Sequence, residues 1–412
     1  MTPATSGRSP PPAFSVWRGR SLPSIPDRWR PALLVTAAVA VGWAGWSGHA
    51  LTLPFAMLFP ALWAWAPNRV TAAAVSMGYF LAASRGLPQG VASFFGTSVW
   101  AGSLLWVGAS LAFVLVQTVL WTPDPGMTRA LRFLLATGLM AVPPFGIVGW
   151  AQPATAAGVL FPGWGWWGLA ATMISLAMLT MAWGHLVGIL LASVWLWSAA
   201  NWEPPVAPPA WTGMEMTKGA RLGRDASIEQ HRELIRLVLQ AVGVANAHVV
   251  VLPENALGIW TPTVEHLWRD TLEGRDLMVI AGAMTVDRGG YDSVVMGITA
   301  DGGHVIYRAR MPVPVAMWQP WRWITDEPGG ARAHFFANPT VEFGGNRLVP
   351  LICYEQLILW PVLESMLYQP DLLVGISNAW WAGNSSIPGI QRANLQAWAR
   401  LFDRPLVISV NM

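Results

Sequence analysis

One cysteine and two carboxylates are the residues whose chemistry stands out in this chain. Cys353 is the only cysteine in 412 residues, and it follows an apolar run, Leu348–Ile352, that predicts a buried strand. A single cysteine can form neither an intrachain disulfide nor a thiolate metal cage. Cys353 is therefore either a buried structural thiol, which is common in protein cores, or a nucleophile. Its position at a strand end favours the nucleophile, because rigid elements place reactive groups at pocket rims.

A carboxylate follows another predicted strand. Glu254 comes directly after the apolar run Ala247–Pro253, and Glu355 lies two residues after Cys353. A thiol is a weak nucleophile until a base removes its proton, which a carboxylate within hydrogen-bond distance can do. The carbonyl that it attacks also needs a cationic or N–H donor for its developing oxyanion. Two predicted strand ends therefore carry groups suited to covalent catalysis by a thiol.

The composition separates the chain into two halves. Hydrophobic residues make up 54% of it and charged residues only 11%, with a net charge of +3. Residues 31–200 are nearly uncharged, whereas residues 203–412 have the composition of a globular domain. The first half is therefore predicted to be embedded in a membrane. We find no basic stripe that would indicate a nucleic-acid partner, and no ligand spacing that would indicate a metal or cofactor.

The apolar half predicts about seven membrane-spanning helices between residues 31 and 200. Residues 1–30, rich in proline and arginine, are expected to form a disordered basic lead. The last apolar segment, Trp166–Ala200, is too long for one crossing, so we split it near Gly184-His185. Pro143-Pro144 should break the fifth segment. Seven crossings place everything after Asn201 outside the cytoplasm, whereas six would leave it inside. The predicted segments are Pro31–Gly48, Leu51–Ala66, Val70–Ser84, Phe94–Trp121, Arg129–Trp150 and the two parts of Trp166–Ala200.

A proline-rich linker at residues 201–212 is expected to lead into a second domain, residues 213–412. Strands and helices alternate there, which predicts a layered α/β domain. The predicted strands are Ala247–Pro253, Asp276–Met284, Ser293–Thr299, His304–Arg308, Leu348–Ile352, Asp371–Ser377 and Pro405–Val410. The predicted helices are Ala226–Val242, Leu357–Tyr368 and Ile390–Leu401.

Four short motifs occur in the order seen in the nitrilase, or carbon-nitrogen hydrolase, superfamily. They are Pro253-Glu254-Asn255-Ala256, Tyr307-Arg308-Ala309-Arg310, Ile352-Cys353-Tyr354-Glu355 and Ile376-Ser377-Asn378-Ala379-Trp380. With its membrane half included, the chain resembles the apolipoprotein N-acyltransferases. Within that likeness it is most similar to a family of plasmid conjugal transfer proteins. The resemblance covers nearly everything from residue 31 onwards and implies a four-layer αββα sandwich on the periplasmic side of the bacterial inner membrane.

The resemblance also assigns roles to residues. It implies Glu254 as the base, Cys353 as the nucleophile and Glu355 as a supporting carboxylate beside Tyr354; from the residues alone Glu355 could equally form a structural salt bridge. In the acyltransferases an acyl chain passes from a phospholipid to the cysteine and then to a lipoprotein amine. Membrane phospholipid, a lipoprotein and proteins of the conjugation apparatus are therefore the expected partners. Trp380 and Trp381 should either wall an acyl pocket or pack in the core.

The chain departs from the family pattern in two places. The family lysine position is Ala309, so Arg310 or Lys218 would have to supply the cation. The chain also stops at Met412, where the family continues with further strands and a membrane helix. A sandwich truncated in this way should expose a sheet edge, which invites a dimer or a partner. The alternative to an enzyme is a membrane factor that kept the fold and lost catalysis.

Overall fold

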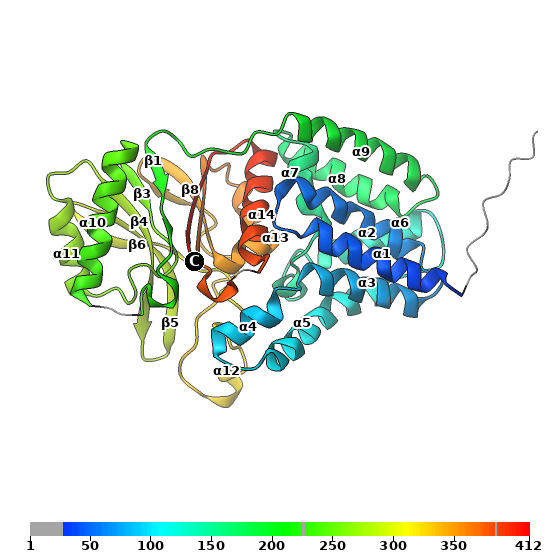
Figure 1. The fold of residues 1–412 in the computed structure, drawn as a ribbon, viewed down its shortest axis with the longest axis horizontal. Helices are drawn as coiled ribbons and strands as arrows, with labels where there is room; N and C mark the ends of the chain where they lie inside the picture. Colours follow the sequence, from blue (N-terminus) through cyan, green and yellow to red (C-terminus); the bar gives the residue numbers. More distant parts are fainter. Residues whose placement is uncertain (1–27, 225–226, 384) are drawn as a thin grey trace, which may run out of the picture.

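The computed structural model describes residues 28–224, 227–383 and 385–412, so most of the predicted basic lead lies outside the described residues. The chain forms a helical half and an α/β half that pack side by side (Figure 1). The last helix of the first half ends at Ala200, and the first strand of the second half begins at Trp211.

The helical half follows the predicted apolar segments. The division of the last segment is confirmed, because α8 ends at Leu179 and α9 begins at Gly184. The predicted proline break is also confirmed, since α6 ends at Leu139, before Pro143-Pro144. The helices are α1 (Arg30–Gly45), α2 (Phe59–Ala64), α3 (Arg69–Ala83), α4 (Leu87–Phe95), α5 (Val99–Leu120), α6 (Met127–Leu139), α7 (Ala157–Leu160), α8 (Gly165–Leu179) and α9 (Gly184–Ala200), with 3₁₀ segments η1 (Ala50–Leu58), η2 (Phe145–Val148) and η3 (Pro153–Ala156).

One helix of the described residues, α5, is long and apolar enough to cross a bilayer. It has 22 residues, and five other apolar stretches of 10–17 residues are shorter than a usual crossing. One face of α5 is exposed, including Trp100, Leu104, Leu111 and Leu115. The described elements therefore contain one membrane-length helix rather than the seven that the sequence predicts.

Two five-stranded sheets form the centre of the α/β half. The first sheet has the order β1-β3-β4-β5-β6 and the second β2-β10-β9-β8-β7. Valine and isoleucine dominate the central strands, as expected for strands buried on both faces. The strands are β1 (Trp211–Gly213), β2 (Glu215–Met216), β3 (Val249–Val251), β4 (Met278–Asp287), β5 (Gly290–Thr299), β6 (Gly302–Arg308), β7 (Val341–Phe343), β8 (Asn346–Ile352), β9 (Leu372–Asn378) and β10 (Leu406–Asn411).

Helices cover the outer face of each sheet, which gives the predicted four-layer αββα sandwich. Helices α10 (Ile228–Ala245) and α11 (Pro262–Leu272) lie on the first sheet, and α13 (Leu359–Met366) and α14 (Ile387–Phe402) lie on the second (Figure 1). The sequence analysis missed α11, although its start carries the usual signals, an N-cap threonine followed by proline. A short helix, α12 (Arg322–Thr325), lies in the long loop after β6.

The second sheet is enclosed between the first sheet and the helical half. Helices α13 and α14 lie between this sheet and the helical half, and one apolar cluster continues from the helical half into α14 (Figure 1). The contact is close: a Cβ added to Gly158 of α7 would lie 1.7 Å from the carbonyl oxygen of Ala397. Strand β10 pairs with β9 along its length and with the short strand β2 at Val410 and Asn411. The two halves therefore form one packed unit.

Candidate active site

Cys353 lies in a sharp turn at the end of β8. The turn places it at a positive φ of 45°, in the left-handed region that non-glycine residues adopt rarely, often at functional sites. The 3₁₀ segment η5 (Cys353–Leu357) follows. Gln391 of α14 holds the turn, because its amide donates to the carbonyl oxygen of Cys353 over 2.8 Å and lies 3.8 Å from the sulfur. The thiol is thus fixed in position while only 4% of the residue is exposed.

Glu254 faces this thiol from the first sheet. It follows β3, is 7% exposed, and accepts a hydrogen bond of 3.0 Å from the backbone N–H of Asn378. The thiol of Cys353 and the carboxyl group of Glu254 line the same two cavities, and each group influences the pKa of the other. Burial raises the pKa of Glu254 to about 7, and burial and the neighbouring carboxylate raise the pKa of the thiol. This is the geometry of a nucleophile and its base.

Glu355 lies in the core and not at the mouth of the site. It is fully buried and accepts hydrogen bonds from Tyr307 and from three backbone N–H groups, those of Arg310, Met311 and Ile352. The bond to Ile352, at 2.7 Å, fixes the residue before the nucleophile. Burial raises the pKa of this carboxyl, and the Arg310 charge opposes that rise. Glu355 therefore ties the end of the Tyr307 strand to the Cys353 turn.

The structure directs Arg310 away from the thiol. Its guanidinium is fully buried and donates to Tyr307 over 3.0 Å, to Glu364 over 3.2 Å and to Ser365 over 3.0 Å. Two of these partners belong to α13, on the far side of the second sheet. This placement argues against the expected oxyanion donor, because the donors are already used in the core. Arg310 acts on the site only through Tyr307 and Glu355.

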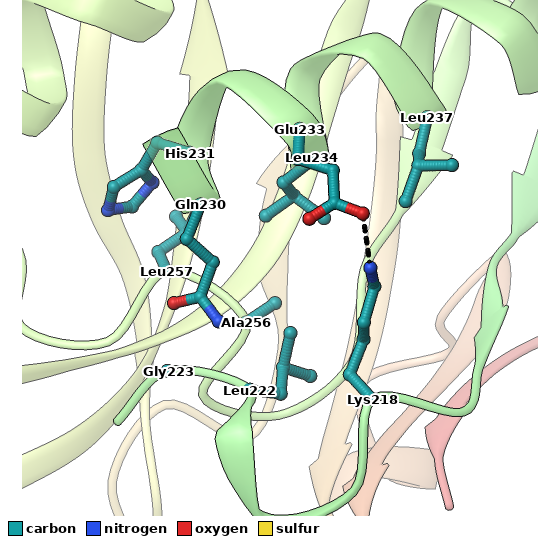
Figure 2. Close-up of a pocket in the computed structure, with 10 residues that line it drawn as sticks. All are labelled: Lys218, Leu222, Gly223, Gln230, His231, Glu233, Leu234, Leu237, Ala256 and Leu257. Atoms are coloured by element: carbon teal, nitrogen blue, oxygen red, sulfur yellow. Dashed lines mark hydrogen bonds and ion pairs between the residues drawn. The ribbon is translucent and has the colours of Figure 1, made fainter. Parts of the chain in front are cut away.

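Lys218 also fails to reach the thiol. Its ammonium group lies 2.5 Å from Glu233 of α10, across a separate small pocket that includes His231 and Gln230 (Figure 2). Lys218 was a candidate because it lies at the end of the first predicted strand of the α/β half, but the pocket that it lines does not contain Cys353. Neither expected substitute for the family lysine therefore lines the site.

Two apolar cavities meet at Cys353, and both are completed by the helical half. One, of about 190 Å³, extends past Trp380 to Phe94 of α4; the other, of about 280 Å³, extends along α5 to Gly108. Trp381 lines both, and Gly90 of α4 packs directly on it. The predicted pocket tryptophans thus do line the cavities, which are suited in shape and polarity to an apolar chain.

Tyr354, which the sequence places beside Glu355 and which we also expected to contact substrate, joins the two halves at the site. Its side chain lines the cavity along α5, and its hydroxyl donates to the carbonyl oxygen of Ile147 over 2.6 Å. Gln391 and Asn378 as positioning residues, and α4 as a cavity wall, were not predicted from the sequence. Asn378 is part of the Ile376–Trp380 motif, so the motif could have identified it. Gln391 lies outside the four motifs, and nothing in its neighbouring residues marks it as a site residue.

The profile of the carbon-nitrogen hydrolase family matches residues 81–400. The chain therefore belongs to the carbon-nitrogen hydrolase family, the class that the four-layer fold and the Glu254–Cys353 pair also indicate. Within this class it belongs with the conjugal transfer proteins TraB. It is 52% identical to conjugal transfer protein TraB of Agrobacterium fabrum over 99% of both chains. It is 55% identical to probable conjugal transfer protein TraB of Sinorhizobium fredii, over 93% of this chain and 99% of that protein.

More distant similarities fall on parts of the chain. An apolipoprotein N-acyltransferase of Verminephrobacter eiseniae is 28% identical over 189 residues, which cover 42% of this chain and 35% of that protein. Among solved structures, an amidase from Nesterenkonia sp. superposes with a TM-score of 0.37 and 15% identity, over 50% of this chain and 78% of that one.

Proposed function

We propose that this protein is a multi-pass inner-membrane component of plasmid conjugation whose Cys353 transfers an acyl group through a thioester. The observation that carries the proposal is the position of the thiol: it is paired with Glu254 and lies where two apolar cavities meet. The distant likeness to an apolipoprotein N-acyltransferase supports the same chemistry. The α/β half would then lie on the periplasmic side, with phospholipid as the donor and a lipoprotein or a conjugation protein as the acceptor.

The proposed first step is a balanced acyl transfer. Glu254 takes the proton of the Cys353 thiol as the sulfur attacks the acyl carbonyl carbon. A carbon–sulfur bond forms, the ester carbon–oxygen bond breaks, and Glu254 returns the proton to the departing alcohol oxygen. In the second step an acceptor amine attacks the thioester, its proton passes through Glu254 to the sulfur, and an amide is released. A base with a pKa of about 7 is suited to both transfers near neutral pH.

Labelled phospholipid tests the proposal directly. The purified protein is incubated with vesicles that carry a radiolabelled acyl chain, and the label on the chain is measured after denaturation. Because Cys353 is the only cysteine, a hydroxylamine-sensitive thioester label can lie only there. Cys353→Ala should carry none. A wild-type chain that stays unlabelled with every donor class would contradict the proposal.

A second candidate function is a structural factor of conjugation without catalysis. The observation that favours it is that no basic residue of the described chain lines the small cavity beside Glu254: Ala309 lies there, Arg310 and Lys218 point elsewhere, and Arg224 lines only the larger cavity. The two candidates differ in the effect of Cys353→Ala on plasmid transfer. Transfer at the wild-type frequency, with normal amounts of the variant in the membrane, would favour the structural factor.

A further inference from the structure

A small cavity lies next to Glu254 and Cys353 and is separate from most of the apolar space. Its volume is about 10 Å³, roughly what one water-sized group needs. Glu254, Cys353, Ser293 and Ala309 contribute to its wall. The methyl group of Ala309 leaves space there that a longer side chain would fill. The cavity shares Glu254, Ser293 and Cys353 with the larger cavity that extends to Trp380, so a ligand in the larger cavity can reach it.

The carboxyl group on this cavity has no cationic partner within the described part of the chain. The main influences on Glu254, besides burial, are Asn378, Cys353 and Glu355, and none of them is a cation. Three basic side chains of the surrounding elements are paired elsewhere: Arg308 with Asp292, Arg310 with Glu364, and Lys218 with Glu233. Arg224 lines the larger cavity, where it lies over the ring of Trp380, and it is not among the groups that influence Glu254. A buried carboxylate without a cation is costly, so a bound cation would be stabilised here.

Further acceptors belong to residues on the walls of the two cavities. The side-chain oxygen of Asn255 is buried and has no hydrogen-bond partner among the described residues. Asn255 lines the cavity that leads to Trp380, and Ser293 lines both cavities. A ligand that donates a hydrogen bond would satisfy this buried acceptor. A primary ammonium group fits, because it has a positive charge, three donors, no acceptor and about the size of one water.

We infer that the cavity beside Glu254 and Ala309 binds a primary ammonium group, so that the substrate supplies the positive charge that the chain lacks at this site. The inference rests on the proposed function only for the identity of the substrate. An acyl donor would carry the ammonium group close to its reacting carbonyl, and an acceptor would carry it as its reacting amine. Ethanolamine headgroups of phospholipids and the terminal amine of an acceptor protein both have this chemistry. A neutral or anionic molecule would leave Glu254 without a partner.

Thiol-specific reagents test the charge preference without any acyl transfer. Aminoethyl and propyl methanethiosulfonate have similar sizes, and each forms a mixed disulfide when the thiolate attacks its sulfur and methanesulfinate leaves. Each rate at Cys353 is divided by the rate with a small free thiol at the same pH. We expect the normalised rate of the aminoethyl reagent to exceed that of the propyl reagent by about tenfold. This factor corresponds to the contribution of one charge-assisted hydrogen bond. Equal ratios, or no reaction with either reagent, would overturn the inference.

Matched variants separate the cavity from a general surface charge. Ala309→Met fills the same space without a charge, and Glu254→Gln keeps the shape and removes the charge, so both should bring the ratio close to one. Ala309→Lys should favour the propyl reagent, because it places a fixed ammonium group in the cavity. Thermal melting of each variant verifies that it is folded. A tenfold preference that persists in Glu254→Gln would show that another group attracts the cation.

Protection experiments distinguish the two sources of the ammonium group. Vesicles of phosphatidylethanolamine are compared with vesicles of phosphatidylglycerol, and a peptide with a free terminal amine with its acetylated form. If the amine-bearing member of only one pair slows the modification of Cys353, the cavity is assigned to that source of the ammonium group. Equal rates within both pairs would overturn its assignment to a substrate. If Cys353 gains no label from phospholipid but strongly prefers the aminoethyl reagent, acyl transfer is rejected and the ammonium site is kept.

Discussion

Two buried glutamates, Glu254 and Glu355, lie near the turn that carries Cys353, and their surroundings give them different roles. Glu355 is surrounded by backbone N–H groups and by the Tyr307–Arg310 pair, so its charge is satisfied and its position is fixed. Glu254 has one backbone donor, from Asn378, and the thiol. The weaker compensation leaves Glu254 as the group that gains and loses a proton near neutral pH.

The raised pKa of Glu254 predicts a pH-dependent gain in stability for Glu254→Gln. The folded carboxyl has a pKa of about 7 and the ordinary value is 4.5, so the folded state holds the extra proton between these values. Stability from this group is therefore present below pH 4.5 and lost as pH rises to 7. Glu254→Gln should melt close to wild type at pH 5 and be more stable at pH 8, by up to about 3 kcal/mol. An equal shift at both pH values would contradict a raised pKa.

Arg310 should be the most sensitive basic residue of the α/β half. Arg310→Met leaves Glu355 without its cation in the core, so we expect a loss of about 3–5 kcal/mol in unfolding free energy. Arg308→Met, two residues earlier at the end of β6, is the control, because the Arg308 side chain is 39% exposed and Asp292 keeps Arg332 and His334. The control should lose about 1 kcal/mol or less. Similar losses in denaturant melts of both variants would show that the buried network adds little.

At the scale of elements, the hairpin of α4 and α5 forms the wall that closes the site. Gly102 allows the close contact, because a Cβ there would lie 2.2 Å from the carbonyl oxygen of Pro88 on α4. Gly90 meets Trp381 with similar closeness. The shape of both cavities at Cys353 therefore depends on small residues in the helical half. This is why the α/β half by itself does not define the site.

A pair of glycine substitutions on α5 tests this dependence. Gly102→Val should separate α4 from α5 and destabilise the protein by about 1–3 kcal/mol, the usual range for overpacking. It should also alter the rate at which Cys353 reacts with propyl methanethiosulfonate. Gly108→Val on the same helix meets no atom within 4 Å at its Cβ and should leave melting close to wild type. If both variants melt alike, the α4–α5 contact does not matter for stability.

At the scale of the whole molecule, the helical half packs on the second sheet through α13 and α14. The only membrane-length helix of the described residues, α5, lies at the site itself and exposes an apolar face. Placing α5 in a bilayer would bring the cavities at Cys353 to the edge of the membrane.

Reporter fusions test the proposed topology. Seven crossings place the chain after Asn201 in the periplasm, so alkaline phosphatase fused there should be active and green fluorescent protein dark. Fusions after Trp121 and after Leu160 provide internal controls, because each added crossing should invert the signal. A fluorescent and phosphatase-negative fusion after Asn201 would place Cys353 in the cytoplasm and remove the proposed periplasmic lipoprotein acceptor.

The sequence by itself determined the class of fold and the reactive pair. Local periodicity and segment length can be read from consecutive residues, and they predict the strands, the linker and the division near Gly184. Cys353 and Glu254 stand out for the same reason, since each directly follows an apolar strand. Thr261 and Pro262 also mark the start of α11 in the local sequence, but this helix was not predicted.

Only the tertiary structure decided where the basic residues point and what surrounds the thiol. Arg310 is two residues from a predicted site strand, yet its guanidinium crosses to α13, and Lys218 turns to α10. The cavities combine α4 and α5 with loops more than two hundred residues away. Side-chain direction and cavity shape arise from contacts between distant segments, and a one-dimensional pattern records no such contact.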